Sequence, residues 1–360
     1  MSSKKDKFSL KDKNYMKLAL KLAGARIGLT GENPSVGCLI VKNDRIISIG
    51  QTGFCGTPHA ENNAIKNSVE KLKGSKMYVT LEPCNHYGKT PPCTKSIIKS
   101  GISEVIYAID DIDKRVKGKS FKILSTKNIR VKRGLLKAQA KNLYDTYIKN
   151  RTKKLPYVTA KIAVTKNKVI YSKSKKRITD ISSDKITHYL RYKNDSIMIS
   201  SKTVNIDNPK LNCRLKGYEK FSPKRIILDR NLEIKLNTYI FKSAKKNNTI
   251  LFHSLQNNKK IKNLKKKGII LIKFKTENNG LFSLRKILKK LYFLGVRNLL
   301  IEGGDKITKN LIRERLIDIF YFFQSPLVLP KSVHNKSFTS FAILNNKYKK
   351  KYKFNSKLVK

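Results

Sequence analysis

The sequence predicts two α/β domains that meet near residue 150. Segments with helical and strand periodicity alternate along the chain, which is typical of layered α/β domains. The length of 360 residues exceeds one small domain and fits two of ordinary size. A polar stretch, NRTKKLP, separates the two series of elements and ends at Pro156. We therefore place a first domain at 1–150, a second at 151–330 and a basic C-terminal segment at 331–360.

The first half of the chain predicts a helix at 12–27, capped by Asp12 or Asn14, because apolar residues recur there at helical spacing. Two β-type runs, 36–41 and 46–49, are joined through Asn43-Asp44, which indicates a hairpin. The other elements expected here are a helix beginning near His59, a strand at 76–81, a helix after Pro91-Pro92, a strand at 105–109 and a helix at 135–148.

The second half predicts a further α/β domain with at least six strands. These strand-like runs are 157–164, 196–200, 225–229, 249–253, 269–274 and 298–301. Helical patterns lie between them at about 184–193 and 281–294. The lysine-rich residues 331–360 have few periodic apolar positions and fit either an edge strand or a frayed tail.

The formal net charge is +56, since 80 Lys and Arg face 24 Asp and Glu. Such an excess is found in proteins that bind nucleic acid or anionic membranes. However, only 15 of the basic residues are Arg, Asn is abundant and Trp is absent, a pattern that AT-rich codons would produce without selection for binding. Nucleic-acid sites favour Arg and interleaved aromatic residues. We therefore expect neither a nucleic-acid nor a membrane partner.

The cellular compartment is predicted from what the sequence lacks. The longest apolar run, 316–329, is interrupted by Asp318, Gln324 and Pro326. The basic N-terminal stretch is followed by no apolar segment, which argues against a secretory signal. Five unevenly spaced cysteines do not make a disulfide framework. A cytoplasmic location is the expectation.

The strongest chemical signal is a set of candidate zinc ligands, His59, Cys84 and Cys93, with Glu61 two residues after the histidine. Each ligand lies at a predicted strand-to-helix junction. Three protein ligands leave one tetrahedral position for water, the arrangement of catalytic zinc sites. Glu61 would act as general acid and base beside the metal, as in zinc deaminases of bases and nucleotides. Cys55 is a competing ligand, and unrelated half-buried thiols are the simpler alternative.

The spacer between the two cysteines departs from the ordinary deaminase pattern of two residues. Eight residues, NHYGKTPP, separate Cys84 from Cys93, and their polar and cationic groups suggest a specific anionic or phosphorylated substrate. Together with NPSVGC at 33–38 and HAE at 59–61, the segment LEPCNHYGKTPPC at 81–93 resembles the bifunctional deaminase/reductases of riboflavin biosynthesis, the RibD family. The resemblance extends to about residue 330.

This resemblance implies a cytidine-deaminase-like α/β/α zinc domain that deaminates diaminohydroxyphosphoribosylaminopyrimidine. Asn33, His86 and Lys89 would position the pyrimidine and its phosphate. Lys89 stands where the family usually has arginine, which keeps the charge and loses the bidentate fork. Residues 111–118, DIDKRVKG, replace a family pattern D-P-N-P-x-V-x-G, so both prolines are absent.

In the second domain, LLIEGG at 299–304 precedes a helical pattern and could present free N–H groups to a phosphate or form a tight turn without a ligand. The resemblance implies a dihydrofolate-reductase-like domain that uses NADPH. Its cofactor contacts would be Ala163, Arg177, Thr203, Asp207 and Gly304. Its substrate contacts would be Arg191, Leu211, Arg214 and Glu302.

Several positions depart from the family in this second domain. The turn that reads S-L-D-G in the family is Thr165–Lys168 here. Arg177 replaces the tryptophan near the cofactor, and Arg230 replaces the serine that follows the strand-like run 225–229. The leading hypothesis remains a two-step enzyme that uses zinc and NADPH on a small phosphorylated pyrimidine, as a homo-oligomer. The alternatives are a deaminase with an eroded reductase domain, an RNA-editing zinc deaminase, and a binding protein with a degenerate zinc site.

Overall fold

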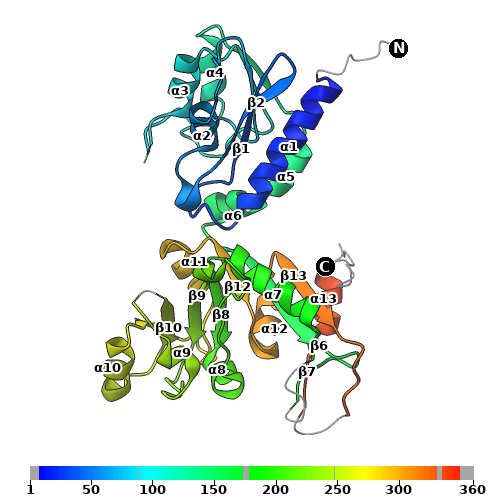
Figure 1. Ribbon diagram of the computed structural model, residues 1–360. Helices are drawn as coiled ribbons and strands as arrows, with labels where there is room; N and C mark the ends of the chain where they lie inside the picture. Colours follow the sequence, from blue (N-terminus) through cyan, green and yellow to red (C-terminus); the bar gives the residue numbers. More distant parts are fainter. Residues whose placement is uncertain (1–7, 89, 173–177, 247, 331–334, 349–360) are drawn as a thin grey trace. The chain divides into compact units, whose positions relative to one another are not determined.

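The computed structural model describes residues 8–88, 90–172, 178–246, 248–330 and 335–348. The chain divides into two compact units, Met1–Lys154 and Leu155–Lys360 (Figure 1). Within the described residues, no helix combines the length and the apolar character needed to cross a bilayer.

The first unit is built on a five-stranded mixed sheet with the strand order β2-β1-β3-β4-β5. The strands β3, β4 and β5 are parallel, and β1 is antiparallel to both of its neighbours. The strands are β1 (Gly37–Lys42), β2 (Arg45–Gln51), β3 (Lys76–Val79), β4 (Glu104–Tyr107) and β5 (Arg130–Arg133). The helices are α1 (Leu10–Arg26), α2 (Ala60–Lys66), α3 (Cys93–Ser100), α4 (Lys119–Ser125), α5 (Lys137–Leu143) and α6 (Asp145–Lys153), with a 3₁₀ turn at Phe54–Gly56.

Two glycines allow helices to lie directly on this sheet. A Cβ at Gly37 would lie 2.0 Å from the carbonyl oxygen of Ala19 in α1. A Cβ at Gly50 would lie 2.1 Å from the carbonyl oxygen of Ala60 at the start of α2. Because Gly50 pairs with Cys38, the neighbour of Gly37, the two glycines face opposite sides of the sheet. Helices α1 and α2 therefore cover opposite faces, and the α/β/α prediction for this domain is confirmed.

The predicted hairpin is present, and the first helix begins earlier than predicted. Asn43 and Asp44 join β1 to β2 with φ values of 48° and 58°, the left-handed pair that suits a two-residue hairpin. Helix α1 is capped by Ser9, whose side chain accepts a hydrogen bond from the N–H of Asp12. Asp12 returns the bond to the N–H of Ser9, so the expected cap residue is the third helical residue of a capping box.

The second unit contains a seven-stranded sheet with the order β11-β10-β9-β8-β12-β6-β13, in which every neighbouring pair is parallel. These strands are β6 (Tyr157–Val164), β8 (Ser196–Ser200), β9 (Lys224–Leu228), β10 (Thr249–His253), β11 (Ile270–Lys273), β12 (Asn298–Ile301) and β13 (Ile319–Gln324). The helices are α7 (Ile181–Lys193), α8 (Ser201–Asp207), α9 (Tyr239–Lys242), α10 (Asn258–Lys266), α11 (Leu284–Phe293), α12 (Asp305–Arg313) and α13 (Phe341–Lys347), with a 3₁₀ turn at Glu219–Phe221.

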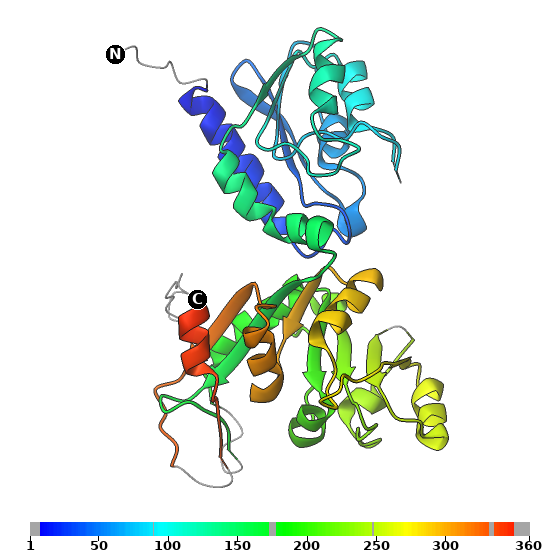
Figure 2. The ribbon, with the colours of Figure 1, turned by 180° about the vertical axis from the view of Figure 1, so that it is seen from behind.

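Two hydrophobic cores cover the two faces of this sheet. Ile197 and Ile199 of β8 belong to a core that includes residues of α7, α8, α9 and α10. Met198, between them, belongs to the other core, which includes residues of α11, α12 and α13. Since side chains alternate along a strand, these two groups of helices lie on opposite faces (Figures 1 and 2). The α/β prediction for the second domain is also confirmed.

The described part of the predicted C-terminal segment is folded onto this unit. Strand β14 (Lys336–Ser337) pairs with β7 (Val169–Tyr171) in a two-stranded antiparallel sheet. Phe338 and Leu344 are buried in the core that includes α11 and α12. Asp305 accepts hydrogen bonds from Thr339 and Ser340. For residues 335–348 the structure is therefore an edge pairing followed by a packed helix, and the frayed tail is wrong.

Candidate active sites

The three predicted zinc ligands converge in the first unit. His59 is the N-cap of α2, Cys84 follows β3, and Cys93 is the first residue of α3. The Nδ1 of His59 lies 3.3 Å from the Sγ of Cys93 and 3.4 Å from the Sγ of Cys84. All three donor atoms lie within 4.8 Å of one another. Cys55 is exposed and is not a member of this group.

These donor atoms fit a zinc ion. Ligands at about 2.0–2.3 Å from a tetrahedral zinc lie roughly 3.5–3.8 Å apart, close to the two nitrogen–sulfur distances. Zinc binds cysteine as the thiolate. A hydrogen bond from Cys93, together with one from the His59 ring, holds the pKa of the Cys84 thiol well below its usual range. One nitrogen and two sulfur donors form an open set, which is the composition of a catalytic site.

Glu61 lies beside this group without being part of it. It is the second residue of α2 and only 4% exposed. Burial raises the pKa of its carboxyl to about 7, with a further contribution from the nearby Cys84. Glu61, His59 and Cys84 line one cavity of about 280 Å³. Glu61 therefore meets the requirement for a general acid and base, because its carboxyl group lines the same cavity as the metal ligands.

The long spacer between the cysteines supplies polar atoms to this region. The side chains of Asn85, His86 and Thr90 each carry a buried polar atom that has no hydrogen-bond partner in the described structure. His86 and Thr90 line the cavity, and so does Asn33, whose Nδ2 donates to the carbonyl oxygen of Gly56 at 2.9 Å. Buried polar groups are almost always paired, so unpaired ones in a cavity indicate a ligand or water that pairs them. Lys89, also expected here, lies outside the described residues.

Part of the cavity lining comes from the loop after β4, and a buried carboxylate holds this loop. Glu82 is 2% exposed and accepts hydrogen bonds from three main-chain N–H groups. Its Oε2 lies 3.2 Å from the nitrogen of Asp111 and 3.0 Å from that of Gly118. Its Oε1 lies 3.2 Å from the nitrogen of Ser120. Glu82 therefore joins the segment next to Cys84 to both ends of a loop that lines the cavity.

The same loop contains an ion pair where the related pattern has prolines. Arg115 donates from Nε and Nη2 to the two carboxylate oxygens of Asp113, at 3.0 and 2.6 Å. This pairing lowers the pKa of the Asp113 carboxyl far below its usual range. Asp113, Arg115, Tyr147 and Arg151 all line the cavity. The sequence analysis missed Tyr147 and Arg151 as site residues, because spacing within one segment cannot show that α6 reaches the cavity. It missed Glu82 because the main-chain partners of that carboxylate lie in a distant loop.

In the second unit, the predicted cofactor residues Thr203 and Gly304 are neighbours. Strands β8 and β12 are adjacent and parallel, and their carboxyl ends lead into α8 and α12, which lie on opposite faces of the sheet. In open α/β sheets the crevice at such a point is where ligands bind. A Cβ added to Gly304 would lie 3.9 Å from the Oγ1 of Thr203.

The start of α12 offers the kind of group that binds a dinucleotide phosphate. Gly304 is the N-cap of α12, and no side chain caps the first N–H groups of that helix. Such groups bind phosphate. The carboxylate of Asp305, the first residue of α12, is held by Thr339 and Ser340. Ala163 is half-buried in β6, and Asp207 is exposed at the end of α8. Arg177 lies outside the described residues.

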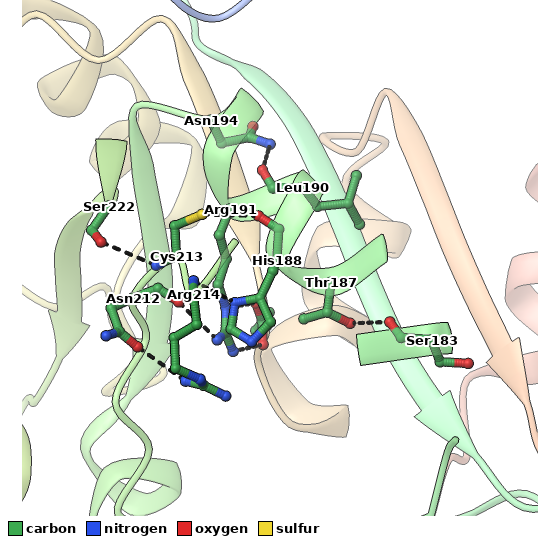
Figure 3. Close-up of polar contacts among 11 residues, drawn as sticks. Ser183, Thr187, His188, Leu190, Arg191, Asn194, Asn212, Cys213, Arg214 and Ser222 are labelled. Atoms are coloured by element: carbon green, nitrogen blue, oxygen red, sulfur yellow. Dashed lines mark hydrogen bonds and ion pairs between the residues drawn. The ribbon is translucent and has the colours of Figure 1, made fainter. Parts of the chain in front are cut away.

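The predicted substrate residues form a second group around α7. Arg191 donates from Nε and Nη2 to the two oxygens of Glu302, both at 2.8 Å. Its Nη1 donates to the carbonyl oxygen of Asn212 at 3.1 Å. The resemblance implies that this guanidinium meets the substrate, yet its donors have protein partners here. Among the described residues, the side chain of Arg214 bonds only to the Oδ1 of Asn212 (Figure 3), and Arg214 is exposed. Leu211 is buried and adopts a φ of 55°.

Comparison with known proteins identifies both units. Residues 9–109 match the family described as the cytidine and deoxycytidylate deaminase zinc-binding region. Residues 156–359 match the family described as the RibD C-terminal domain. The match to the second family covers more than half of the chain.

Whole-chain relatives have the same two-unit organisation. The riboflavin biosynthesis protein RibD of Aquifex aeolicus is 37% identical over 320 residues, which cover 88% of each chain. The RibD protein of Buchnera aphidicola is 33% identical, over 89% of this chain and 88% of its own. The structure of Acinetobacter baumannii RibD superposes with a TM-score of 0.80 at 28% identity, over 91% of this chain and 90% of its own. A Thermotoga maritima diaminohydroxyphosphoribosylaminopyrimidine deaminase/5-amino-6-(5-phosphoribosylamino)uracil reductase superposes with a TM-score of 0.78 at 31% identity, over 92% and 90% of the two chains.

Proposed function

The chain belongs to the RibD family, and on that premise we propose that its two units catalyse successive steps of riboflavin biosynthesis. The first unit deaminates diaminohydroxyphosphoribosylaminopyrimidine, and the second reduces the ribosyl group of 5-amino-6-(5-phosphoribosylamino)uracil with NADPH. The observation that carries this function is the convergence of His59, Cys84 and Cys93 beside Glu61, in one cavity with an eight-residue spacer.

The deaminase chemistry follows from the donor set and the buried acid. His59, Cys84 and Cys93 would hold Zn²⁺, which when bound lowers the pKa of a water molecule toward neutrality. Glu61 takes a proton from that water and delivers it to the ring amine. The water oxygen would add to the ring carbon that carries the amine, the carbon–nitrogen bond would break with loss of ammonia, and the oxygen would remain on the ring as a carbonyl. In this scheme Asn33, His86 and Lys89 position the pyrimidine and its phosphate.

The reductase chemistry takes place at the carboxyl ends of β8 and β12. NADPH supplies the hydride. Thr203 and the Gly304 turn would hold its phosphates, with Ala163, Asp207 and Arg177 as further cofactor contacts. Leu211, Arg214 and Glu302 would contact the phosphorylated substrate, and we assign Arg191 to holding Glu302 in place. An exposed guanidinium such as that of Arg214 suits a phosphate, because its donors match phosphate oxygens.

One assay on the purified chain tests both steps. The diamino pyrimidine is supplied with and without NADPH, ammonia is measured, and absorbance at the nicotinamide band is followed. We expect ammonia in both reactions and NADPH oxidation only once deamination has occurred. Glu61→Gln should keep its zinc and release no ammonia, and full activity in this variant would contradict the mechanism. Deamination without NADPH oxidation would favour the alternative of an eroded reductase.

The remaining proposals concern partners. We propose that the enzyme acts in the cytoplasm on small molecules, as a homo-oligomer, without a nucleic-acid or membrane partner. Five unpaired cysteines support a reducing compartment. An RNA-editing deaminase would bind RNA with an affinity that falls steeply as salt rises. In a filter-binding assay, RNA binding whose affinity falls steeply between about 50 and 200 mM salt would therefore contradict the small-molecule assignment.

A further inference from the structure

His188 is a buried histidine that the proposed mechanism does not use. It lies on α7, one turn before Arg191, and is 8% exposed. Its Nδ1 lies 3.1 Å from the main-chain nitrogen of Arg214. Because that nitrogen is a donor, the Nδ1 must accept, and the ring proton is therefore on Nε2. The bond joins α7 directly to the residue proposed to bind the substrate phosphate.

The segment around Arg214 has little regular structure of its own and depends on such contacts. Residues 208–218 lie outside helices and strands, and Asn208 and Leu211 adopt left-handed φ values of 43° and 55°. Non-glycine residues keep such values only where surrounding contacts hold them. Asn208 is held as the C-cap of α8, and its Oδ1 accepts a hydrogen bond from the N–H of Tyr239. Farther along, Ser222 accepts the N–H of Cys213, and further contacts come from α7. The thiol of Cys213 donates to the carbonyl oxygen of His188 at 3.6 Å, and Arg191 donates to that of Asn212.

Within this segment the direction of the Arg214 side chain is also fixed. Its Nη1 donates to the Oδ1 of Asn212 at 3.0 Å, so both ends of the residue are held, the main chain by His188 and the guanidinium by Asn212 (Figure 3). The other guanidinium nitrogens have no partner in the described structure. Figure 3 shows the His188 and Arg191 side chains pointing from α7 toward this segment.

We propose that His188 is a positioning residue of the reductase: by accepting the main-chain N–H of Arg214, it aims the Arg214 guanidinium at the phosphate of the pyrimidine substrate. This inference rests on the proposed reductase function. His188 itself does not touch the substrate. Its contribution depends on the neutral ring, since a protonated imidazole would turn a second donor toward the N–H of Arg214.

The charged surroundings favour that neutral ring. Burial and the cations Arg191 and Arg214 lower the pKa of His188, and Asp184 on α7 acts in the opposite direction. Glu302, at the end of β12, also interacts with the ring and is itself paired with Arg191. The pKa of His188 therefore lies below its ordinary value of 6.5, and the acceptor is present at neutral pH.

The test compares two substitutions in the whole chain. His188→Phe keeps a ring and removes the acceptor, whereas the Oδ1 of His188→Asn can replace Nδ1. A hydrogen bond whose loss leaves a buried N–H unpaired corresponds to roughly a 5- to 150-fold effect. We expect His188→Phe to raise the KM for the phosphorylated uracil at least about fivefold, with kcat within about threefold and the KM for NADPH unchanged. His188→Asn should restore the KM to within about threefold of the wild type.

Three measurements separate positioning from simple stability. With the dephosphorylated uracil, His188→Phe and the wild type should be equally active. Combined with Arg214→Met, His188→Phe should add no further loss, because both act through one guanidinium. In the wild type the KM should rise as the pH falls below the ordinary histidine pKa of 6.5 and the ring gains a proton. His188→Asn should lack the part of that rise that His188 causes. An unchanged KM for NADPH and a urea midpoint of the second unit equal to that of the wild type show that this unit is folded in each variant.

His253 offers a matched control, since it is also buried in this unit and its Nδ1 pairs with the main-chain oxygen of Leu255. His253→Phe should leave the KM for the phosphorylated uracil unchanged. Additive losses in the double variant, equal losses with the dephosphorylated substrate, or no rescue by His188→Asn would overturn the proposal. If His188→Phe does not fold, His188→Asn with its pH profile still decides the question.

A binding measurement separates failure of this inference from failure of the proposed function. Ribose 5-phosphate is titrated calorimetrically into the wild type and His188→Phe in the absence of NADPH. Weaker binding of ribose 5-phosphate to the variant than to the wild type supports the positioning role. If the wild type then oxidises no NADPH, only the proposed reductase function fails. Equal binding, alongside normal NADPH oxidation by the wild type, overturns the positioning role alone.

Discussion

Replacement of Glu82 by Gln should loosen the loop that lines the deaminase cavity. The carboxylate of Glu82 accepts three main-chain hydrogen bonds, from Asp111, Gly118 and Ser120. A glutamine side chain is the same size but has a single oxygen. That oxygen can serve the two N–H groups that now share Oε2, and the amide nitrogen then faces the N–H of Ser120. One buried donor loses its partner, and the other two bonds lose the negative charge of their acceptor.

The size of the effect follows from these bonds. A hydrogen bond to a charged group contributes about 1.5–3 kcal/mol, and an unpaired buried N–H costs about 1–3 kcal/mol. Because the two figures describe overlapping effects, we expect a total of about 2–4 kcal/mol in the free energy of local opening. At about 1.4 kcal/mol per factor of ten, amide hydrogen exchange should become about 30- to 1,000-fold faster at Asp111, Gly118 and Ser120.

The assay is native-state hydrogen exchange on the whole chain, followed by mass spectrometry of peptides that cover 110–121. Glu70→Gln is a matched control, because Glu70 is exposed and the same change there should alter stability by less than about 0.5 kcal/mol. Exchange in the second unit should be unchanged in both variants. Unchanged protection of the loop in Glu82→Gln would refute the idea that this carboxylate holds it. Equal acceleration throughout the first unit would instead mean that the whole unit is destabilised.

Three further predictions concern the metal, a buried ion pair and pH. Cys93→Ser should lower the zinc content measured by mass spectrometry after dialysis from about one ion per chain to a small fraction, with NADPH oxidation on supplied uracil substrate unaffected. Arg191→Met should destabilise the second unit to urea by about 3–5 kcal/mol, because Glu302 is left buried and unpaired, and adding Glu302→Leu should recover most of that loss. Burial raises the pKa of Asp195 from 3.8 to about 6, so its ionisation costs stability as the pH rises through 6. The second unit should lose about 1–2 kcal/mol from this residue between pH 5 and 8, and urea midpoints of Asp195→Asn should lack that part of the slope.

The elements predicted from the sequence are those whose residues have a clear periodicity. Strands β1, β8 and β12 are apolar runs in the centre of a sheet, and they lie where the sequence placed them. Strand β5, with the sequence RVKR, carries charged residues on a sheet edge and shows no apolar pattern. In α10 only Leu264 is buried, so its lysine-rich sequence resembles a linker. Both elements are stabilised by long-range packing that local sequence does not contain.

The same reasoning explains which site residues could be found. His59, Cys84 and Cys93 were predictable because each has a side chain suited to zinc and follows a strand-like run, with His59 and Cys93 at helix starts. Glu82 and Arg151 carry ordinary charged side chains, and only the folded loop and α6 bring them to the cavity. Spacing along the chain reveals residues that bind a metal. It does not reveal groups whose partners are main-chain atoms of a distant loop.

The departures in the reductase unit are better explained by compensation than by erosion. An eroded turn at Thr165–Lys168 would lack specific contacts, yet the turn is closed by a bond from Lys168 to Thr165 and by the Thr165 hydroxyl, which accepts from Val169. Asn167 bonds to both main-chain groups of Leu329.

The C-terminal segment contributes directly to this turn. The ammonium of Lys168 lies 4.4 Å from the ring centre of Phe341 in α13, and β14 pairs with β7 immediately after the turn. Lys168 takes a left-handed φ of 67°, a conformation that normally favours glycine, and these contacts offset its cost. A segment that sequence composition alone would describe as a basic tail thus supports the hairpin at which the family pattern is lost. These contacts favour an ordered turn over an eroded one at the position where the family pattern is lost.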